Sequence, residues 1–481
     1  MRREFLINII YLLGLNLIIK PFYIFFIDRE VQLRVGDADY ELYFSLFSFC
    51  IIFQILTDLG IHLFSMNEVS AKREDFHAYF PNFLMLKGVL GILYFAVLFV
   101  GAYLIGYREP RAYNLILILG GYQLMLSFLL FFRSNITAIG FHRIDSLLSG
   151  VDKFILTFLL GYLLYFRPGL EMSIEYFVMA QLCSVSVATL IASVVLIPKM
   201  DKDKWKVDFN QMRKYLVAAL PYALSVLLAA IYIRSDAVML ERLGGEGNQG
   251  AIYAYSYRYY DFLNMIGYLF AGILLPILSN MWSNQKDVKP LLNTSASLLF
   301  SIAITLSCSI IFHAQDIFHF LYPSKPTTTE YIYPTYALML SFICVCGTYI
   351  YGTFLLTAKK LRELNKLYFA GFILNVGLNL YGIPKYGATG AAITTLITQF
   401  FILIVQFIWV YRMGLVKNEL IQKLGLYVLV YSLTLYGIHL INLSSWMLSF
   451  ILSCLIGGFI SLVIGLISIR SMHSILSQKI N

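Results

Sequence analysis

The stretch "PYALSVLLAAIYIRSDAVML" (residues 221–240) places an arginine and an aspartate in an apolar segment long enough to cross a membrane. A bilayer core about 30 Å thick requires roughly 20 predominantly apolar residues in one helix. Charge is costly at that depth, and an ionisable side chain found there usually faces a wet cavity or a partner. The stretch therefore indicates a membrane-spanning helix in which Arg234 and Asp236 serve a purpose other than packing.

The rest of the chain shares this apolar character. Of its 481 residues, 59% are hydrophobic and 13% are charged, and the mean hydropathy is +0.75. A soluble protein carries about 25% charged residues, so the deficit is too large for a soluble core. We therefore predict an all-α integral membrane protein with most of the chain in lipid.

The length criterion predicts about fourteen transmembrane helices. The first begins after a basic start, but its apolar part is too long for a cleaved signal peptide, so we interpret it as a retained span. The predicted spans lie near residues 5–27, 42–66, 82–106, 112–132, 146–166, 174–197, 214–234, 250–282, 291–313, 331–357, 367–383, 388–411, 422–442 and 445–469.

The basic residues predict the orientation. With the amino terminus in the cytoplasm, most of the 36 lysines and arginines fall on the inner side, as in "PKMDKDKWKVDFNQMRKY" (198–215) and "AKKLRELNK" (358–366). This is the positive-inside pattern, and an even number of spans places both termini in the cytoplasm. The net charge of +9 is thus explained by contacts with membrane lipids. Because the basic residues are dispersed between spans, they do not indicate nucleic-acid binding.

The most basic loop divides the chain into two halves and a tail. We predict a six-helix lobe over residues 1–200, a second over 201–412, and two additional helices over 413–481. Aliphatic helix ends followed by polar inner loops recur between the halves, as in residues 56–75 and 266–287. An even number of spans per half makes the repeats parallel, and transport substrates usually bind between such repeats.

Motifs for chemical catalysis are weak. The six cysteines form no paired framework, so neither a zinc site nor a disulfide scaffold is expected. "GEGNQG" (245–250) matches a dinucleotide-binding pattern but follows an apolar helix and not a strand, so we interpret it as a turn. "HAQDIFH" (313–319) offers a metal or proton-shuttle alternative to an interfacial loop. The sequence contains no P-loop, H-E-x-x-H or G-x-S-x-G motif, and we expect no enzyme activity.

Three motifs together resemble a known family. "LNVGLNLYGIPKYGATGAAITTLITQF" (374–400) resembles a late signature of bacterial polysaccharide flippases, within the multidrug/oligosaccharidyl-lipid/polysaccharide exporter superfamily. "ILTDLGIHLFSMNEVSAKRE" (55–74) is similar to their second-span end, and residues 221–258 resemble their seventh and eighth spans. The motifs occur in the family's order over nearly the whole chain. A departure is the second-span end, where Met66-Asn67-Glu68 replaces the more usual arginine-glutamate pair.

The resemblance implies a flippase of the bacterial cytoplasmic (inner) membrane. It would move an undecaprenyl-pyrophosphate-linked oligosaccharide, a precursor of a surface polysaccharide such as O-antigen in lipopolysaccharide, to the outer leaflet by alternating access. Such proteins use no cofactor and make no change to the sugar's bonds. A polysaccharide polymerase is a possible partner.

Three basic side chains are candidates for binding the pyrophosphate. Lys20, Arg234 and Arg258 lie at comparable depth in the first, seventh and eighth spans, about 10 Å from a span end. The resemblance implies that these spans line the central cavity. Arginine offers a fork of hydrogen-bond donors to phosphate oxygens, and lysine offers a compact charge. We therefore predict a cationic cleft made by these three residues.

Acidic residues in the same spans have alternative roles. Asp236, Asp261 and Asp58 are candidates for lining the cavity or coupling transport to an ion gradient. Arg258 and Asp261, three residues apart on a helix, could instead neutralise each other. A basic side chain near an interface can also extend outward along lipid. For Asp58 and Lys87 a structural role is at least as well supported.

Three other functions remain open. A peptidoglycan precursor flippase of the lipid II type would need the same cations. A drug or cation exporter of the same superfamily would favour acidic residues facing the cavity. A membrane polymerase or ligase would need a larger outer loop than residues 314–330 provide.

Overall fold

The computed structural model describes residues 18–61, 76–167, 169, 171–199, 208–441 and 445–467. In these ranges every regular element is a helix, which confirms the predicted all-α membrane fold. Most of the first predicted span and the segment 62–75, which contains Met66-Asn67-Glu68, lie outside the described residues.

Twelve of the described helices are long and apolar enough to cross a membrane. One of them, α15 (Leu361–Arg412), has 52 residues and contains a non-helical position at Gly387. At 1.5 Å per residue it is more than twice as long as a bilayer core is thick, so it supplies two spans. Together with the predicted first span, this agrees with about fourteen transmembrane helices.

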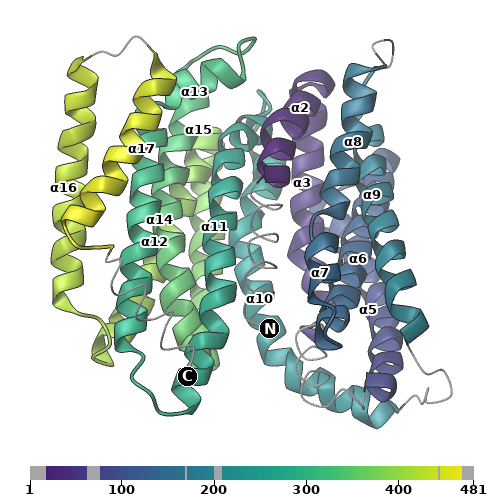
Figure 1. Cartoon of the computed structure of the whole chain (residues 1–481). Coiled ribbons are helices and arrows are strands. Elements are labelled where there is room, and N and C mark those ends of the chain that lie inside the picture. The colour runs from purple at the N-terminus through teal and green to yellow at the C-terminus, as the bar shows by residue number, and fades with distance from the viewer. Residues whose placement is uncertain are drawn as a thin grey trace. The chain divides into compact units, whose positions relative to one another are not determined.

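By contacts the chain divides into unit 1 (Met1–Ala251) and unit 2 (Ile252–Asn481) (Figure 1). Helix α10 packs against α3 within unit 1, and the boundary near residue 200 between the two predicted lobes stays a prediction. The helices of unit 1 are η1 (Tyr23–Asp28), α2 (Arg29–Val35), α3 (Asp37–Phe53), η2 (Gln54–Thr57), α5 (Phe76–Ile105), α6 (Pro110–Ala138), α7 (His142–Leu148), α8 (Val151–Tyr165), α9 (Ile174–Leu196), η4 (Ile197–Lys199) and α10 (Phe209–Leu243).

The interior of unit 1 is built around α6. This helix begins at Pro110, a residue suited to the first helical turn, and it packs against α9, α3 and α5. Phe80 and Phe83 of α5 and Phe131 of α6 are fully buried in its aromatic core. The rings of Phe80 and Phe131 stack with their centroids 5.2 Å apart. Many other apolar side chains are exposed on the outer helix faces, as expected for a protein surrounded by lipid.

In the sequence, the second predicted span ends in the motif "LTDLG" (56–60), and in the structure the α-helix stops there. A short 3-10 helix, η2, follows α3, and Leu59 and Gly60 both have positive φ angles, 46° and 81°. A positive φ is uncommon for a leucine and marks a locally strained backbone. The turn sets the position of Asp58, whose side chain is considered below.

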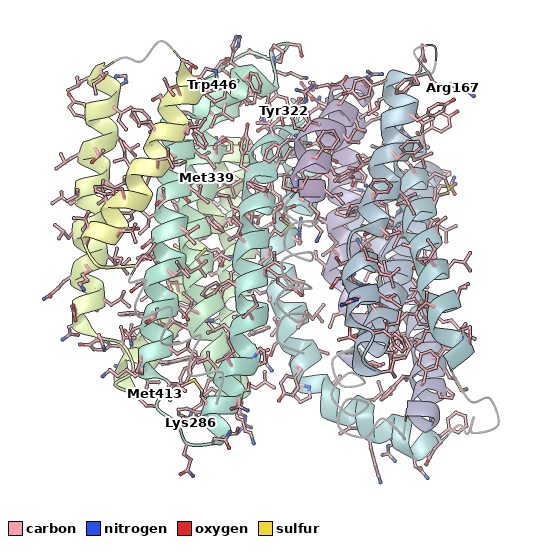
Figure 2. All side chains as sticks on the ribbon, viewed as in Figure 1. Arg167, Lys286, Tyr322, Met339, Met413 and Trp446 are labelled. Atoms are coloured by element: carbon pink, nitrogen blue, oxygen red, sulfur yellow. The ribbon has the colours of Figure 1, made fainter. Side chains whose placement is uncertain are left out.

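Unit 2 is built on the packing of α14 against α15. Its helices are α11 (Gln249–Ser283, which begins in unit 1), α12 (Lys289–Phe312), α13 (Ala314–Leu321), α14 (Thr329–Thr357), α15, α16 (Asn418–Ile441) and α17 (Trp446–Val463). Helix α12 packs on α14, and α16 and α17 both pack on α12 (Figure 1). Figure 2 shows Tyr322 and Trp446 at one end of this unit and Lys286 and Met413 at the other.

A network of hydrogen bonds from hydroxyl groups joins α16 and α17 to α12. Tyr427 and Tyr431 of α16 hydrogen bond to Thr305 and Ser309 at oxygen–oxygen distances of 2.6 and 2.7 Å. Tyr431 also lies 3.2 Å from the carbonyl oxygen of Ser453 in α17. Buried hydroxyls need such partners, because an unpaired polar group in an apolar interior is costly.

The signature "YGIPKYGATGAA" (381–392) forms the sharp bend inside α15. Gly387 has φ 54° and ψ −132°, a conformation that favours glycine. Beyond the bend the two arms of the helix approach closely, since a Cβ added to Gly390 would lie 2.1 Å from the carbonyl oxygen of Gly382. The small residues of this motif are therefore required by backbone geometry.

The segment "GEGNQG" is the turn that the sequence predicts. It connects the end of α10 at Leu243 to the start of α11 at Gln249. Gly245 and Gly247 have φ angles of 69° and 106°, which explains the glycines without a nucleotide site.

Candidate functional site: charged side chains within the spans

The spans of unit 1 contain a cluster of basic side chains. It consists of Lys20, Arg133 and Lys153 together with Asp28, Asp145 and Asp152, and we call it the basic cluster of unit 1. Lys20 interacts electrostatically with Asp152, Lys153 and Arg133, which places all three near it. The helical residues 18–22, α6, α7 and α8 therefore contribute charged groups to one region.

Lys153 has the most extensive contacts in this cluster. Its Nζ donates a hydrogen bond to the hydroxyl of Tyr122 over 3.2 Å and lies 3.9 Å from a carboxylate oxygen of Asp152. It also lies over the rings of Tyr23 and Tyr122, 5.1 and 5.6 Å from their centroids. Aromatic faces stabilise a cation that has lost part of its hydration. Lys153 is thus held as a cation within the helix bundle.

Arg133 is positioned by a neighbouring short helix. Its Nε donates to Asp145 Oδ1 of α7 over 2.7 Å, and both side chains are largely buried. A single contact through Nε leaves the two terminal nitrogens of the guanidinium available for planar recognition of an anion. The α6–α7 packing thus orients this arginine.

The basic cluster of unit 1 contains equal numbers of basic and acidic side chains. Lys20, Arg133 and Lys153 stand against the carboxylates of Asp28, Asp145 and Asp152. Lysine and arginine in combination suit a phosphate group, the first as a compact charge and the second as a fork of donors. A diphosphate could therefore replace hydration that these cations have lost.

Asp58 has a different partner. Lys87 of α5 is fully buried, and its Nζ lies 2.6 Å from Asp58 Oδ1, 2.6 Å from Ser127 Oγ and 3.2 Å from the carbonyl oxygen of Thr57. The rings of Phe128 and Phe131 lie 5.6 Å from the same nitrogen. Lys87 thereby donates hydrogen bonds to the buried polar groups at the strained end of the second span. These contacts favour the structural role considered for this pair.

Arg258 is buried in unit 2. It has 5% of its surface exposed and donates a hydrogen bond to the hydroxyl of Tyr322, at the end of unit 2 where Figure 2 places that residue. Tyr322 in turn packs edge-on against Tyr255, with ring centroids 4.5 Å apart. The guanidinium therefore lies among tyrosines and points away from lipid.

The remaining predicted residues lie on α10 and α11. Arg234 is partly buried, Asp236 is 1% exposed, and Asp261 is partly buried. The structure brings Lys20 together with Arg133 and Lys153. Lys20 and Arg234 belong to unit 1 and Arg258 to unit 2, so convergence of these three cations on one cleft stays a prediction.

The candidate metal motif "HAQDIFH" has a packing role at its first histidine. The ring of His313 is buried, with Nδ1 3.0 Å from the Ser309 carbonyl oxygen and Nε2 2.9 Å from Ser449 Oγ. Nδ1 thus contacts the last turn of α12, and Nε2 joins the end of α12 to α17. Within the described ranges no group of three His, Cys, Asp or Glu side chains is placed to hold a metal ion.

The family follows from a sequence comparison. A model described as "Polysaccharide biosynthesis protein" matches residues 5–282, more than half of the chain. The chain belongs to this polysaccharide biosynthesis protein family. The matched region includes every charged residue of the basic cluster, the Asp58–Lys87 pair, and the predicted residues Arg234, Asp236, Arg258 and Asp261. No curated protein matches the sequence significantly.

Solved structures share the fold of this family member. The lipid II flippase MurJ, in an inward closed conformation, is 15% identical, with a TM-score of 0.72, over 98% of this chain and 99% of that one. A multidrug resistance MATE transporter of the MOP superfamily is 14% identical, with a TM-score of 0.62, over 82% and 94%. A MOP superfamily transporter from Pyrococcus furiosus is 14% identical, with a TM-score of 0.61, over 85% and 94%. At this identity the likeness establishes a transporter fold and leaves the substrate open.

Sequence reasoning missed two residues of the basic cluster in this family member. Arg133 lies one position past the predicted fourth span, and Lys153 lies inside the predicted fifth span in the segment "VDKF" (151–154). The usable signal is a lysine within an otherwise apolar span, the criterion that selected Lys20.

Proposed function

We propose that this protein is a flippase that carries an undecaprenyl-pyrophosphate-linked oligosaccharide, a surface polysaccharide precursor, across the bacterial cytoplasmic membrane. Membership of the polysaccharide biosynthesis protein family supports a role in this pathway. The likeness of fold to a flippase whose printed name specifies lipid II supports a lipid-linked substrate. A transport role without bond chemistry fits both comparisons.

The basic cluster of unit 1 is the observation that carries the proposal. A charged group within a bilayer costs about 2.5–3.5 kcal/mol on insertion scales, so charged side chains there need partners or a function. Lys153 and Arg133 are held in place by α6, α7 and α8, and Lys20 adds a third positive charge. Arg133 contacts Asp145 through Nε, so the terminal nitrogens of its guanidinium could bind an anionic head group.

The proposed transport cycle uses alternating access between two helix bundles. The pyrophosphate would enter from the cytoplasm and bind the basic cluster, with Arg234 and Arg258 completing its coordination. A change of access would then expose the sugar on the outer side while the polyprenyl chain stays in lipid. Asp236 and Asp261 are proposed to couple this cycle to an ion gradient, whereas the contact of Asp58 with Lys87 favours its structural role. A polysaccharide polymerase would receive the product.

Two substitutions test the assignment of the cations. Arg234→Ala and Lys153→Met should each abolish export of surface polysaccharide while the protein remains in the membrane at normal abundance. Lys385→Gln is the matched control, because Lys385 is an exposed lysine on the turn within α15. Export by Lys153→Met at the level of this control would contradict the role of the basic cluster.

Identification of the accumulated intermediate decides the substrate. After deletion of the gene, the proposal expects an undecaprenyl-pyrophosphate-linked oligosaccharide to accumulate and to be detected by mass spectrometry of extracted lipids. Accumulation of the peptidoglycan precursor, with loss of viability, would instead assign the lipid II role. Drug sensitivity without any lipid-linked intermediate would assign an exporter.

A further inference from the structure

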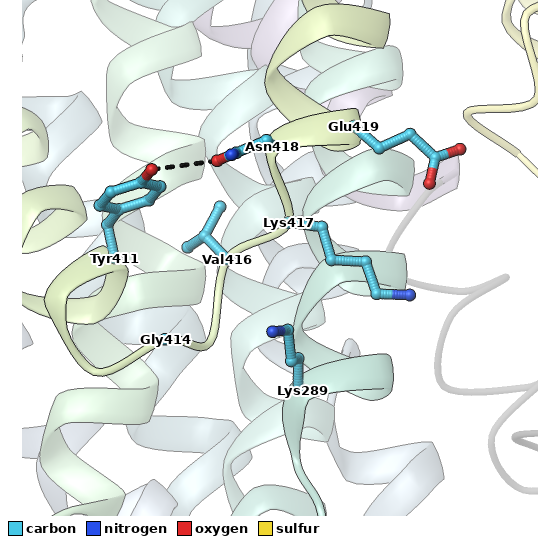
Figure 3. A pocket seen from close by; sticks show the side chains of 7 residues that line it. All are labelled: Lys289, Tyr411, Gly414, Val416, Lys417, Asn418 and Glu419. Carbon is cyan, nitrogen blue, oxygen red and sulfur yellow. Dashed lines mark hydrogen bonds between the residues drawn. The ribbon is translucent and has the colours of Figure 1, made fainter.

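A second charged feature lies in unit 2, far along the sequence from the basic cluster. A shallow cavity of about 660 Å³, largely open to the surface, is lined by residues from the start of α12 and from the connection between α15 and α16 (Figure 3). Its charged lining residues are Lys289, Lys417 and Glu419. The volume lies within the range of small-molecule sites, about 300–1,000 Å³. The cavity is thus large enough for a phosphate-bearing head group.

The cavity is held open by a buried asparagine. Asn293 of α12 is 7% exposed, and its Nδ2 donates to the carbonyl oxygens of Leu415 and Lys289, both at 2.7 Å. Its Oδ1 accepts a hydrogen bond of 2.9 Å from the backbone N–H of Lys417. The bonds to Leu415 and Lys417 fix the loop that carries Lys417 against the helix that carries Lys289, and the bond to the Lys289 carbonyl oxygen lies within α12. The backbone positions of the two lysines are therefore set before any ligand binds.

A further hydrogen bond closes the opposite wall. The hydroxyl of Tyr411, at the end of α15, donates to Asn418 Oδ1 at the start of α16 over 3.0 Å (Figure 3). This hydrogen bond thus joins the two ends of the connection between α15 and α16 to each other.

The charge of the lining favours an anion. Glu419 forms an ion pair of 2.7 Å with Lys423, four residues later on the same helix, and this pair offsets the glutamate charge. Glu419 also interacts electrostatically with Lys417, which it only partly neutralises because Lys423 is the closer partner. Lys289 adds a second positive charge, so the cavity has a positive balance.

Two helices also begin at this cavity. Helix α12 starts at Lys289 and α16 starts at Asn418, and each has 24 residues. The start of a helix carries a partial positive charge from its aligned peptide dipoles. At α12 the carboxylate of Asp287 accepts a hydrogen bond of 2.9 Å from the Lys289 backbone N–H and offsets part of this charge. The start of α16 and the two lysines therefore supply most of the positive field at the cavity.

The predicted topology places this end of unit 2 at the cytoplasmic surface of the membrane. Lys286 and Met413, which adjoin the cavity in sequence, lie together at the end of the unit opposite Tyr322 (Figure 2). The cytoplasmic leaflet carries anionic lipids, and a basic residue near it gains about 1 kcal/mol from their field. An anionic head group would therefore be available at the level of the cavity.

We propose that this cavity is a binding site for a phosphate group, bound between Lys289 and Lys417. The phosphate could belong to an anionic phospholipid of the surrounding leaflet or to a soluble phosphate. The site is separate in the chain from the basic cluster of unit 1, and its existence does not depend on the transported substrate. A bound phosphate would stabilise the packing of the α15–α16 connection against α12.

The first arm of the test measures lipid binding. Full-length protein in detergent is titrated with phosphatidylglycerol or phosphatidylcholine, and bound lipid is measured by native mass spectrometry. The proposal expects preferential retention of phosphatidylglycerol, reduced about 30-fold in affinity by Lys289→Gln combined with Lys417→Gln and about 5-fold by either alone. The control is Lys360→Gln with Lys366→Gln, two exposed lysines elsewhere on the predicted cytoplasmic side, which should bind as the wild type does.

The second arm replaces the lipid by inorganic phosphate, measured by calorimetry on delipidated protein. Phosphate binding that the cavity variant loses and the control keeps, without a lipid preference, supports the site and assigns it to a soluble ligand. A lipid preference that the cavity variant loses assigns it to the membrane. Equal retention of both lipids together with no phosphate binding overturns the proposal. So does a cavity variant that binds as tightly as the control.

Discussion

Replacing Lys87 by methionine should destabilise the protein more than any substitution of an exposed lysine. Methionine preserves most of the side-chain volume but removes three polar contacts: to Asp58, Ser127 and the Thr57 carbonyl oxygen. Asp58, 8% exposed, would then lose the contact of 2.6 Å with the Lys87 ammonium group. Breaking a buried ion pair in this way costs about 3–5 kcal/mol.

Removing both charges isolates the pair itself. Lys87→Met combined with Asp58→Asn removes both charges of the pair, so the free energy of unfolding of the double variant should lie closer to that of the wild type than that of Lys87→Met alone does. The expected coupling is about 1–3 kcal/mol, within the range measured for neighbouring residues in one network. Ser127 keeps a contact of 3.4 Å to the Thr57 carbonyl oxygen in all variants, which limits secondary effects.

The assay is unfolding of purified protein by titration with sodium dodecyl sulfate, followed by circular dichroism. The reasoning predicts a clear loss of stability for Lys87→Met and partial recovery in the double variant. It would be refuted by a Lys87→Met protein within about 0.5 kcal/mol of the wild type, the scale of an ordinary surface substitution. Strict additivity of the two single variants would refute the ion-pair explanation specifically.

Two further predictions concern the packing of unit 2. Gly390→Ala should lower the free energy of unfolding by more than about 2 kcal/mol, because the new Cβ would lie 2.1 Å from the Gly382 carbonyl oxygen. Gly377→Ala, on the same helix with open space around it, should be neutral or stabilising by about 0.5–1 kcal/mol; equal melting of the two would contradict the close approach. Tyr431→Phe should lower the free energy of unfolding by about 1–3 kcal/mol, because hydroxyl and carbonyl groups of α12 and α17 would lose a buried hydrogen-bond partner. Unchanged stability in the same titration would show that these hydrogen bonds are not needed.

Composition and length predicted the membrane fold well, since a bilayer requires helices of a defined length. The sequence also predicted that "GEGNQG" is a turn, which the positive φ angles of Gly245 and Gly247 confirm. Its motifs identified the family that the comparison confirms. These features depend on local sequence alone.

Contacts between distant segments were harder to predict. The sequence singled out Lys20 but not its neighbours Arg133 and Lys153, because the register of α6 and α8 against the first span depends on tertiary packing. The cavity near Lys289 and Lys417 was missed for the same reason, since Asn293 joins segments 122 residues apart. The sequence analysis interpreted basic residues at span ends as signals of topology. It therefore overlooked the basic residues that lie close to one another in the folded chain.

Direct measurement of translocation tests the central claim that cations within the spans carry a lipid-linked diphosphate across the membrane. Purified protein is reconstituted into liposomes with a fluorescent undecaprenyl-pyrophosphate-linked sugar, and the fraction of sugar accessible to an impermeant periodate probe is followed over time. The account predicts that wild-type protein and Lys385→Gln accelerate exchange between leaflets and that Lys153→Met does not. Exchange by the wild type no faster than in protein-free liposomes, or equally fast exchange by Lys153→Met, would contradict it.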